Sequence, residues 1–250
     1  MFLDSDDYWC RQDVFKTFDT YIRKDDKVEI IECISYFNSD SRDFQDKEIF
    51  NDLGYQTVSP SGYYTTKHHP CIWTSVYKKK LIETIPFREK VFYEDSDWKI
   101  KAYTSANRIG LLDYRFYVYY ENVQSTVRKK SLNLFFDALE ANILCRQAYR
   151  NSLLDDDVKQ KKLLVSSTSV VRSIIAVRDY SVSDGIKILK AYRNSYYYHD
   201  IRKDIPIYSG IFFDILLRIP ILLTLTVKAA IGFKRIFTNW VTDSNDSCPY

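Results

Sequence analysis

Glycine and proline are scarce in this chain, with 6 of each among 250 residues. Because both residue types favour turns, their scarcity counts against a loop-rich all-β design. The 5 cysteines are an odd number without paired spacing, which counts against a disulfide framework or a zinc site and predicts reduced thiols. A Walker-type Gly–Lys loop is also missing, which counts against a phosphoryl-transfer enzyme that holds a nucleoside triphosphate.

The first residues are acidic and lack the apolar run that is typical of a secretory signal. Together with unpaired cysteines, this predicts a cytoplasmic protein. Aromatic residues, in contrast, are abundant, with 21 Tyr and 15 Phe. They supply enough apolar surface for one sizeable core and a smaller appendage.

Charge is unevenly distributed along the chain. Residues 1–50 hold 13 acidic and 7 basic side chains, whereas residues 125–205 hold 9 acidic and 15 basic ones. A basic half can face nucleic acid or an anionic membrane surface. Since the spaced stacking aromatics and zinc ligands of nucleic-acid modules are missing, we expect a membrane surface as partner and no nucleic acid.

Three carboxylates, Asp4, Asp6 and Asp7, follow a short apolar lead at Phe2 and Leu3. Carboxylates suit Mg²⁺ or Mn²⁺, and a metal that keeps substrate phosphates as ligands needs only one or two of them. The alternative is structural: Asp6 or Asp7 caps a helix that runs from Asp7 to Lys24.

A second acidic cluster, Glu94 and Asp95, lies where a short apolar segment leads into a predicted helix. This helix is expected to run to about Asn107 and to bury Trp98 and its neighbours Ala102 and Tyr103. One cluster can bind a metal that neutralises a diphosphate leaving group, while the other supplies a base for an attacking hydroxyl. That combination is suited to moving a sugar from a nucleotide donor to an acceptor.

The remaining pattern alternates strands and helices first and becomes helical later. Gly110 is predicted to stop the helix before it. Strands are predicted at residues 28–37 and 111–120, an irregular stretch at 54–70, one or two helical turns at 78–85, and helices at 131–150, 157–179 and 183–198.

Residues 205–237 are the most apolar stretch, but their longest uncharged runs are nine residues. A spanning helix needs about 20 apolar residues, so we expect amphipathic helices lying at a bilayer interface. The alternative is a buried helix that packs on the domain. We therefore divide the chain into an α/β part at 1–130, a helical region at 131–204 and membrane-associating helices at 205–240.

The string FLDSDDYW resembles the Asp-x-Asp signature of family 2 glycosyltransferases, which have the GT-A fold. The segment 71–128 resembles the downstream pattern of that family. Its elements are Trp73, the stretch 77–82, Phe87, the Glu-Asp pair at 94–95, the turn at 106–109, the aromatic strand at 114–120 and the polar loop at 124–126. The resemblance covers residues 1–128 and implies a partial GT-A, Rossmann-like sheet followed by a C-terminal helical region.

The resemblance also implies roles for individual residues. Asp4 and Asp6 would contact the metal and the diphosphate or ribose of the donor, with Asp7 as a supporting metal residue. Asp95 would be the general base. Glu94 would position the acceptor or the base.

Arg128 follows the polar loop that resembles the family's active-site lid, so a contact with the donor phosphates is expected there. Family members of this kind use a nucleotide-diphospho-sugar with Mg²⁺ or Mn²⁺, invert the anomeric centre and act on saccharide or lipid-linked acceptors. The resemblance thus implies a hexosyltransferase in surface polysaccharide or glycan synthesis, peripheral at the inner face of the membrane. The Gln-x-x-Arg-Trp motif of processive members is absent, which favours the addition of a single sugar.

In the family, nucleotide-binding βαβ units precede the Asp-x-Asp strand, whereas this sequence opens at the motif. Three explanations stay open: the sequence is a fragment, a second chain supplies the missing half, or the protein is degenerate and no longer catalyses. The alternative function is a non-catalytic, membrane-peripheral interaction protein that retains the fold.

Overall fold

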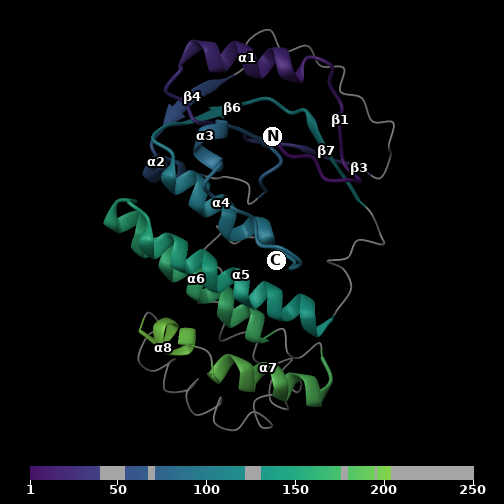
Figure 1. Cartoon of the computed structure of the whole chain (residues 1–250), viewed down its shortest axis with the longest axis vertical. Coiled ribbons are helices and arrows are strands. Elements are labelled where there is room, and N and C mark those ends of the chain that lie inside the picture. The colour runs from purple at the N-terminus through teal and green to yellow at the C-terminus, as the bar shows by residue number, and fades with distance from the viewer. Residues whose placement is uncertain (40–53, 67–70, 122–130, 176–179, 195, 204–250) are drawn as a thin grey trace. The chain divides into compact units, whose positions relative to one another are not determined.

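The computed structural model describes residues 1–39, 54–66, 71–121, 131–175, 180–194 and 196–203 (Figure 1). These residues divide into two compact units. The first unit contains the described residues of 1–90, 94–121 and 151–158, and the second contains those of 91–93, 131–150 and 159–203. Within the described ranges, no helix has both the length and the apolar composition that crossing a bilayer requires.

The first unit is a mixed α/β structure. Its helices are α1 (Val14–Lys24), α2 (Pro60–Thr65), α3 (Lys79–Ile82) and α4 (Glu94–Ser105). Its strands are β1 (Tyr8–Trp9), β2 (Ile30–Cys33), β3 (Phe37–Ser39), β4 (Tyr55–Val58), β5 (Ser75–Tyr77), β6 (Ile109–Leu112) and β7 (Tyr117–Tyr120).

The strands form two sheets. The larger has the order β4-β6-β2-β5, in which β2 and β6 are parallel and both outer pairs are antiparallel. The smaller has the order β1-β7-β3, with β1 antiparallel and β3 parallel to β7. The chain continues from the carboxyl end of β6 into β7, so one continuous segment supplies a strand to each sheet.

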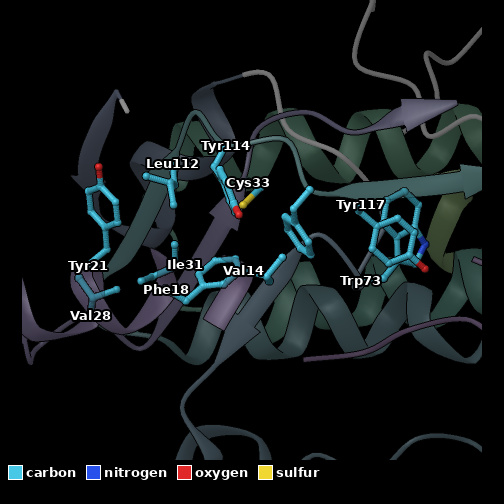
Figure 2. Packing of buried hydrophobic residues seen from close by; sticks show 11 residues of the cluster. Val14, Phe18, Tyr21, Val28, Ile31, Cys33, Trp73, Leu112, Tyr114 and Tyr117 are labelled. Carbon is cyan, nitrogen blue, oxygen red and sulfur yellow. The ribbon is translucent and has the colours of Figure 1, made fainter. Parts of the chain in front are cut away.

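The residues of β2 alternate between two layers, as a strand period of two requires. Ile31 and Cys33 belong to an apolar cluster with Val14, Phe18 and Tyr21 of α1, whereas the intervening Glu32 contacts residues of α4. Aromatic side chains dominate this cluster (Figure 2), and its members also include Val28, Trp73, Leu112, Tyr114, Phe116 and Tyr117.

The second unit contains the long helices α5 (Leu132–Asn151) and α6 (Asp156–Ile175, which begins in the first unit), followed by α7 (Val182–Asn194) and α8 (Tyr196–Arg202). Arg146 of α5 is 1% exposed and connects three of them. Its guanidinium donates to Leu163 O and Ser167 Oγ of α6, both at 2.6 Å, and pairs with Asp200 of α8 at 3.3 Å. A buried cation thus fixes the relative positions of these helices.

Several expected elements are confirmed and others are wrong. Helices occur at 94–105, 132–151, 156–175 and 182–194, as expected, and α3 occupies the short helical stretch. Each of the two predicted strands, 28–37 and 111–120, is divided into two, and the stretch 54–70 contains β4 and α2 where irregular structure is expected. Gly110 does not stop a helix: it lies inside β6, where an added Cβ would come within 2.8 Å of the Tyr55 ring.

Candidate active site

The first acidic cluster lies on a turn whose two ends are anchored. The Asp7 N–H donates to Asp4 O at 3.2 Å, which closes the turn. Before it, the Phe2 ring makes edge contacts with the rings of Tyr77, Phe87 and Trp98, with centroids 5.6, 5.4 and 5.3 Å away. After it, β1 pairs with β7. Aromatic packing on one side and a strand on the other hold the carboxylates in place.

Asp7 faces into the protein. It is 8% exposed, and both of its carboxylate oxygens accept hydrogen bonds, from Tyr117 Oη at 2.7 Å and from the Tyr120 N–H at 2.9 Å. Burial raises the pKa of Asp7, and these two hydrogen bonds oppose that rise. The capping alternative for Asp6 and Asp7 is wrong, because α1 begins only at Val14.

The second acidic cluster forms the first turn of α4, where the positive end of the helix dipole favours carboxylates. Trp98, one turn later, fixes the start of this helix. Its indole N–H donates to Ile85 O at 2.7 Å, and its ring stacks on Phe87 with centroids 4.7 Å apart. The prediction that Trp98, Ala102 and Tyr103 are buried is confirmed.

The residue before this turn, Tyr93, has a φ of 58°. This left-handed conformation costs a non-glycine residue about 1–2 kcal/mol. Lys90, three residues earlier, has the same kind of conformation, with a φ of 59°. Such strained residues concentrate at functional sites, where the surrounding structure holds them.

The structure brings the two acidic clusters together. Burial raises the pKa of Asp4 to about 6, and the further causes are the carboxylates of Asp7, Asp95, Asp6 and Glu94. The contact between Phe2 and Trp98 explains this proximity, because these rings lie two residues before Asp4 and three residues after Asp95. Residues about 90 positions apart in the sequence thus share one electrostatic environment.

Asp95 is half-buried, and its pKa is also raised. Burial and the neighbouring Glu94 raise it, while the helix backbone, Lys99 and Ser96 lower it. A carboxylate in such surroundings binds a proton more tightly than an ordinary aspartate does, which suits a group that accepts a proton during a reaction.

A buried polar cluster, which the sequence alone does not reveal, lies on the side of α4 that faces away from solvent. Glu32 of β2 accepts hydrogen bonds from Lys99 Nζ at 3.0 Å, from Tyr63 Oη at 2.7 Å and from Tyr103 Oη. Lys99 also donates to Cys71 O at 2.8 Å. Lys99 lies one helical turn after Asp95, so this cluster fixes the helix that carries the candidate base. No local signal in the sequence indicates the pairing, because 67 residues separate Glu32 from Lys99.

The donor set of the acidic clusters suits a hard divalent cation, since it consists of carboxylates, and the pKa of Asp4 among them is raised. Among the described residues, no group of three or more His, Cys, Asp or Glu side chains is arranged to hold a metal unaided. A magnesium or manganese ion there would therefore complete its shell with water or the phosphates of a substrate.

Two of the predicted features lie outside the described residues. Arg128, the expected phosphate contact, is one of them, and the apolar segment 205–240 is the other. Their expected roles stay predictions.

No protein-family model matches the sequence, and no curated protein sequence matches it either. Solved structures do. The chain is similar to S. aureus TarS 1–349 in complex with UDP-GlcNAc (19% identity, TM-score 0.61, 92% of this chain and 66% of that one). It is similar to the same protein in complex with UDP (19%, TM-score 0.60, 92% and 65%) and to S. aureus TarS (18%, TM-score 0.59, 92% and 39%).

The chain thus spans less than two thirds of the length of TarS 1–349. At this level of identity the likeness establishes the fold. It is the mixed α/β fold of GT-A glycosyltransferases, as the sequence resemblance predicts, followed by helices.

Proposed function

We propose that this chain is a glycosyltransferase that moves a sugar from a nucleotide-diphospho-sugar to an acceptor hydroxyl. One observation supports this most: in a GT-A fold, Asp4 shares its surroundings with Asp6, Asp7, Glu94 and Asp95. The TarS complexes contain UDP and UDP-GlcNAc, which favours a uridine diphospho-sugar as the donor.

In the proposed reaction, the Asp95 carboxylate takes the proton of the acceptor hydroxyl as its oxygen attacks the anomeric carbon. The bond from that carbon to the diphosphate oxygen breaks, and its electron pair leaves with the diphosphate, so the anomeric centre is inverted. Glu94 orients the acceptor. A bound Mg²⁺ or Mn²⁺ would neutralise the charge on the departing diphosphate.

Asp4 and Asp6 hold the cation and the donor in this proposal, while Arg128 contacts the phosphates. The raised pKa of Asp4 supports its role, because a cation relieves the repulsion between neighbouring carboxylates. The acceptor is a saccharide or a lipid-linked saccharide, and residues 205–240 would bring the protein to the membrane that carries it.

The test is a transfer assay with UDP-sugar donors and Mn²⁺, in which Asp95→Asn is compared with the parent protein. Removing a general base lowers the rate about 10²–10⁴-fold, so we expect a loss of that size. Asp19→Asn is the matched control: it makes the same chemical change on the exposed face of α1, where the Asp19 side chain is 56% exposed and pairs with Arg23.

Equal rates for Asp95→Asn and the parent would show that any turnover does not use this base. The same background rate for both, with no transfer above it, would favour the alternative, a non-catalytic interaction protein that retains the fold. Release of phosphate without glycosyl transfer would contradict the reaction class.

A further inference from the structure

The Tyr117 hydroxyl connects the two ends of the acidic turn. Its oxygen accepts the Asp4 N–H at 3.2 Å and donates its proton to Asp7 Oδ2 at 2.7 Å. We propose that Tyr117 and Asp7 are positioning residues, which hold the turn in the conformation that binds the cation and the diphosphate, and that Asp7 itself is not a metal ligand. This inference rests on the proposed function, since that function gives the turn its ligand.

The direction of the hydrogen bonds supports this division of roles. A tyrosine hydroxyl has one proton, and because its oxygen receives the Asp4 N–H, the proton is directed at Asp7. The other Asp7 oxygen accepts the Tyr120 N–H at 2.9 Å. Asp7 therefore uses both oxygens within the protein, whereas Asp4 keeps part of its surface open to solvent.

The Tyr117 ring is itself fixed. It is fully buried and stacks on the indole of Trp73, with centroids 4.1 Å apart and ring planes 18° apart (Figure 2). The Trp73 indole also packs nearly perpendicular to the Tyr36 ring, with centroids 4.7 Å apart. The hydroxyl consequently has one position, and removing it leaves the packing of the ring in place.

Hydrogen-bond partners behind metal ligands set ligand orientation, and their loss costs about 10–100-fold in metal affinity. A ligand on a short turn depends on such partners more than one on a long helix, because the turn has few other hydrogen bonds. Here the turn itself contributes one, from the Asp7 N–H to Asp4 O.

The test uses the full chain and measures the dissociation constant of Mn²⁺ with UDP by calorimetry. We expect Tyr117→Phe and Asp7→Asn each to weaken binding about tenfold. The double variant should be no weaker than either single variant, because both act through one hydrogen bond. Asp6→Asn, which removes a proposed ligand, should abolish binding.

Tyr114→Phe is the matched control. Tyr114 belongs to the same apolar cluster and donates to an aspartate at a similar distance, Asp13 Oδ1 at 2.8 Å, and that aspartate lies outside the acidic turn. We expect this variant to lose a similar amount of stability and to bind Mn²⁺ and UDP within twofold of the parent.

A second measurement does not depend on any ligand. In the metal-free protein, amide hydrogen exchange in residues 1–9 should be about tenfold faster in Tyr117→Phe than in Tyr114→Phe, because the turn loses its support. The proposal is overturned if exchange is the same in both, or if Asp7→Asn abolishes binding as Asp6→Asn does. If the parent binds no Mn²⁺ or UDP while exchange increases, the positioning role stands and the proposed function fails.

Discussion

The ion pair between Lys99 and Glu32 offers a sharp test of what holds the candidate base in place. Both side chains are almost completely buried, at 5% and 1% exposed. Replacing Lys99 by methionine keeps the length of the side chain but leaves the Glu32 carboxylate without its cation. It also removes the donor to Cys71 O, which connects α4 to the segment before β5.

Removing one partner of a buried ion pair typically destabilises a protein by about 3–5 kcal/mol, because the remaining charge is uncompensated. Two tyrosine hydroxyls still donate to Glu32 in Lys99→Met, so we expect the lower half of that range. Lys79→Met is the control. Lys79 pairs with Glu83 on the surface at 3.5 Å, with the two side chains 88% and 55% exposed, and such pairs contribute less than about 1 kcal/mol.

The assay is equilibrium unfolding in urea, followed by tryptophan fluorescence. Trp73 and Trp98 both belong to the first unit, so they report the unfolding of the part that contains the pair. Glu32→Gln in the Lys99→Met background should recover part of the loss, because it removes the uncompensated charge. The reasoning is refuted if Lys99→Met costs no more than Lys79→Met, or if the second substitution makes the protein still less stable.

Three further predictions concern pH, packing and the membrane. The pKa of Asp4 is about 6 in the folded protein, against 3.8 for an ordinary aspartate, so the folded state binds the proton more tightly than the unfolded state. The stability of the metal-free protein therefore falls as pH rises between these two values, and Asp4→Asn should raise the melting temperature at pH 7.5 and leave it unchanged at pH 3.5. Gly110→Ala should cost about 1–3 kcal/mol in urea unfolding because its Cβ would meet the Tyr55 ring at 2.8 Å, whereas Gly54→Ala, with its nearest atom at 3.6 Å, should change stability little. Deleting residues 205–250 should abolish co-sedimentation with anionic vesicles, and a full chain that stays in the supernatant would contradict the interfacial prediction.

Local signals account for the parts of the fold that the sequence predicts correctly. The helix α4 combines acidic residues in its first turn with apolar residues at helical spacing, and both signals act within a few residues. The helix α2 carries a local signal too, since Ser59 caps it by accepting the Gly62 N–H and Pro60 occupies its first turn. The expectation of irregular structure there overlooks this signal.

The secondary-structure predictions that are wrong concern residues whose contacts lie far away in the sequence. Residues 8–9 are a strand because they pair with residues 117–118, more than a hundred positions later, and no pattern within the first 25 residues indicates this. Position 110 favours glycine because the ring of Tyr55, which belongs to a different strand, packs over it. A propensity is a weak prior when such a contact exists.

The candidate site combines both situations. Its acidic residues stand out in the sequence, but their proximity depends on the contact between Phe2 and Trp98, which the sequence alone does not reveal. The resemblance to glycosyltransferases supplies the expectation that the two clusters meet. The role of Tyr117 has no comparable signal, because nothing distinguishes it among 21 tyrosines until its hydroxyl is placed between Asp4 and Asp7.

A binding site and a structural cluster of acidic residues respond differently to the same substitution. Asp13 represents the structural case: hydrogen bonds from Tyr114 and Arg11 lower its pKa despite burial, so Asp13→Asn should reduce stability and leave Mn²⁺ binding unchanged. The charged groups that shift the pKa of Asp4 are all carboxylates, so Asp4→Asn should increase stability at neutral pH and abolish Mn²⁺ binding. Opposite changes in stability and binding from one substitution are the trade-off expected of a functional site. If Asp4→Asn and Asp13→Asn change stability in the same direction, the carboxylates around Asp4 are structural, and the proposed activity loses its main support.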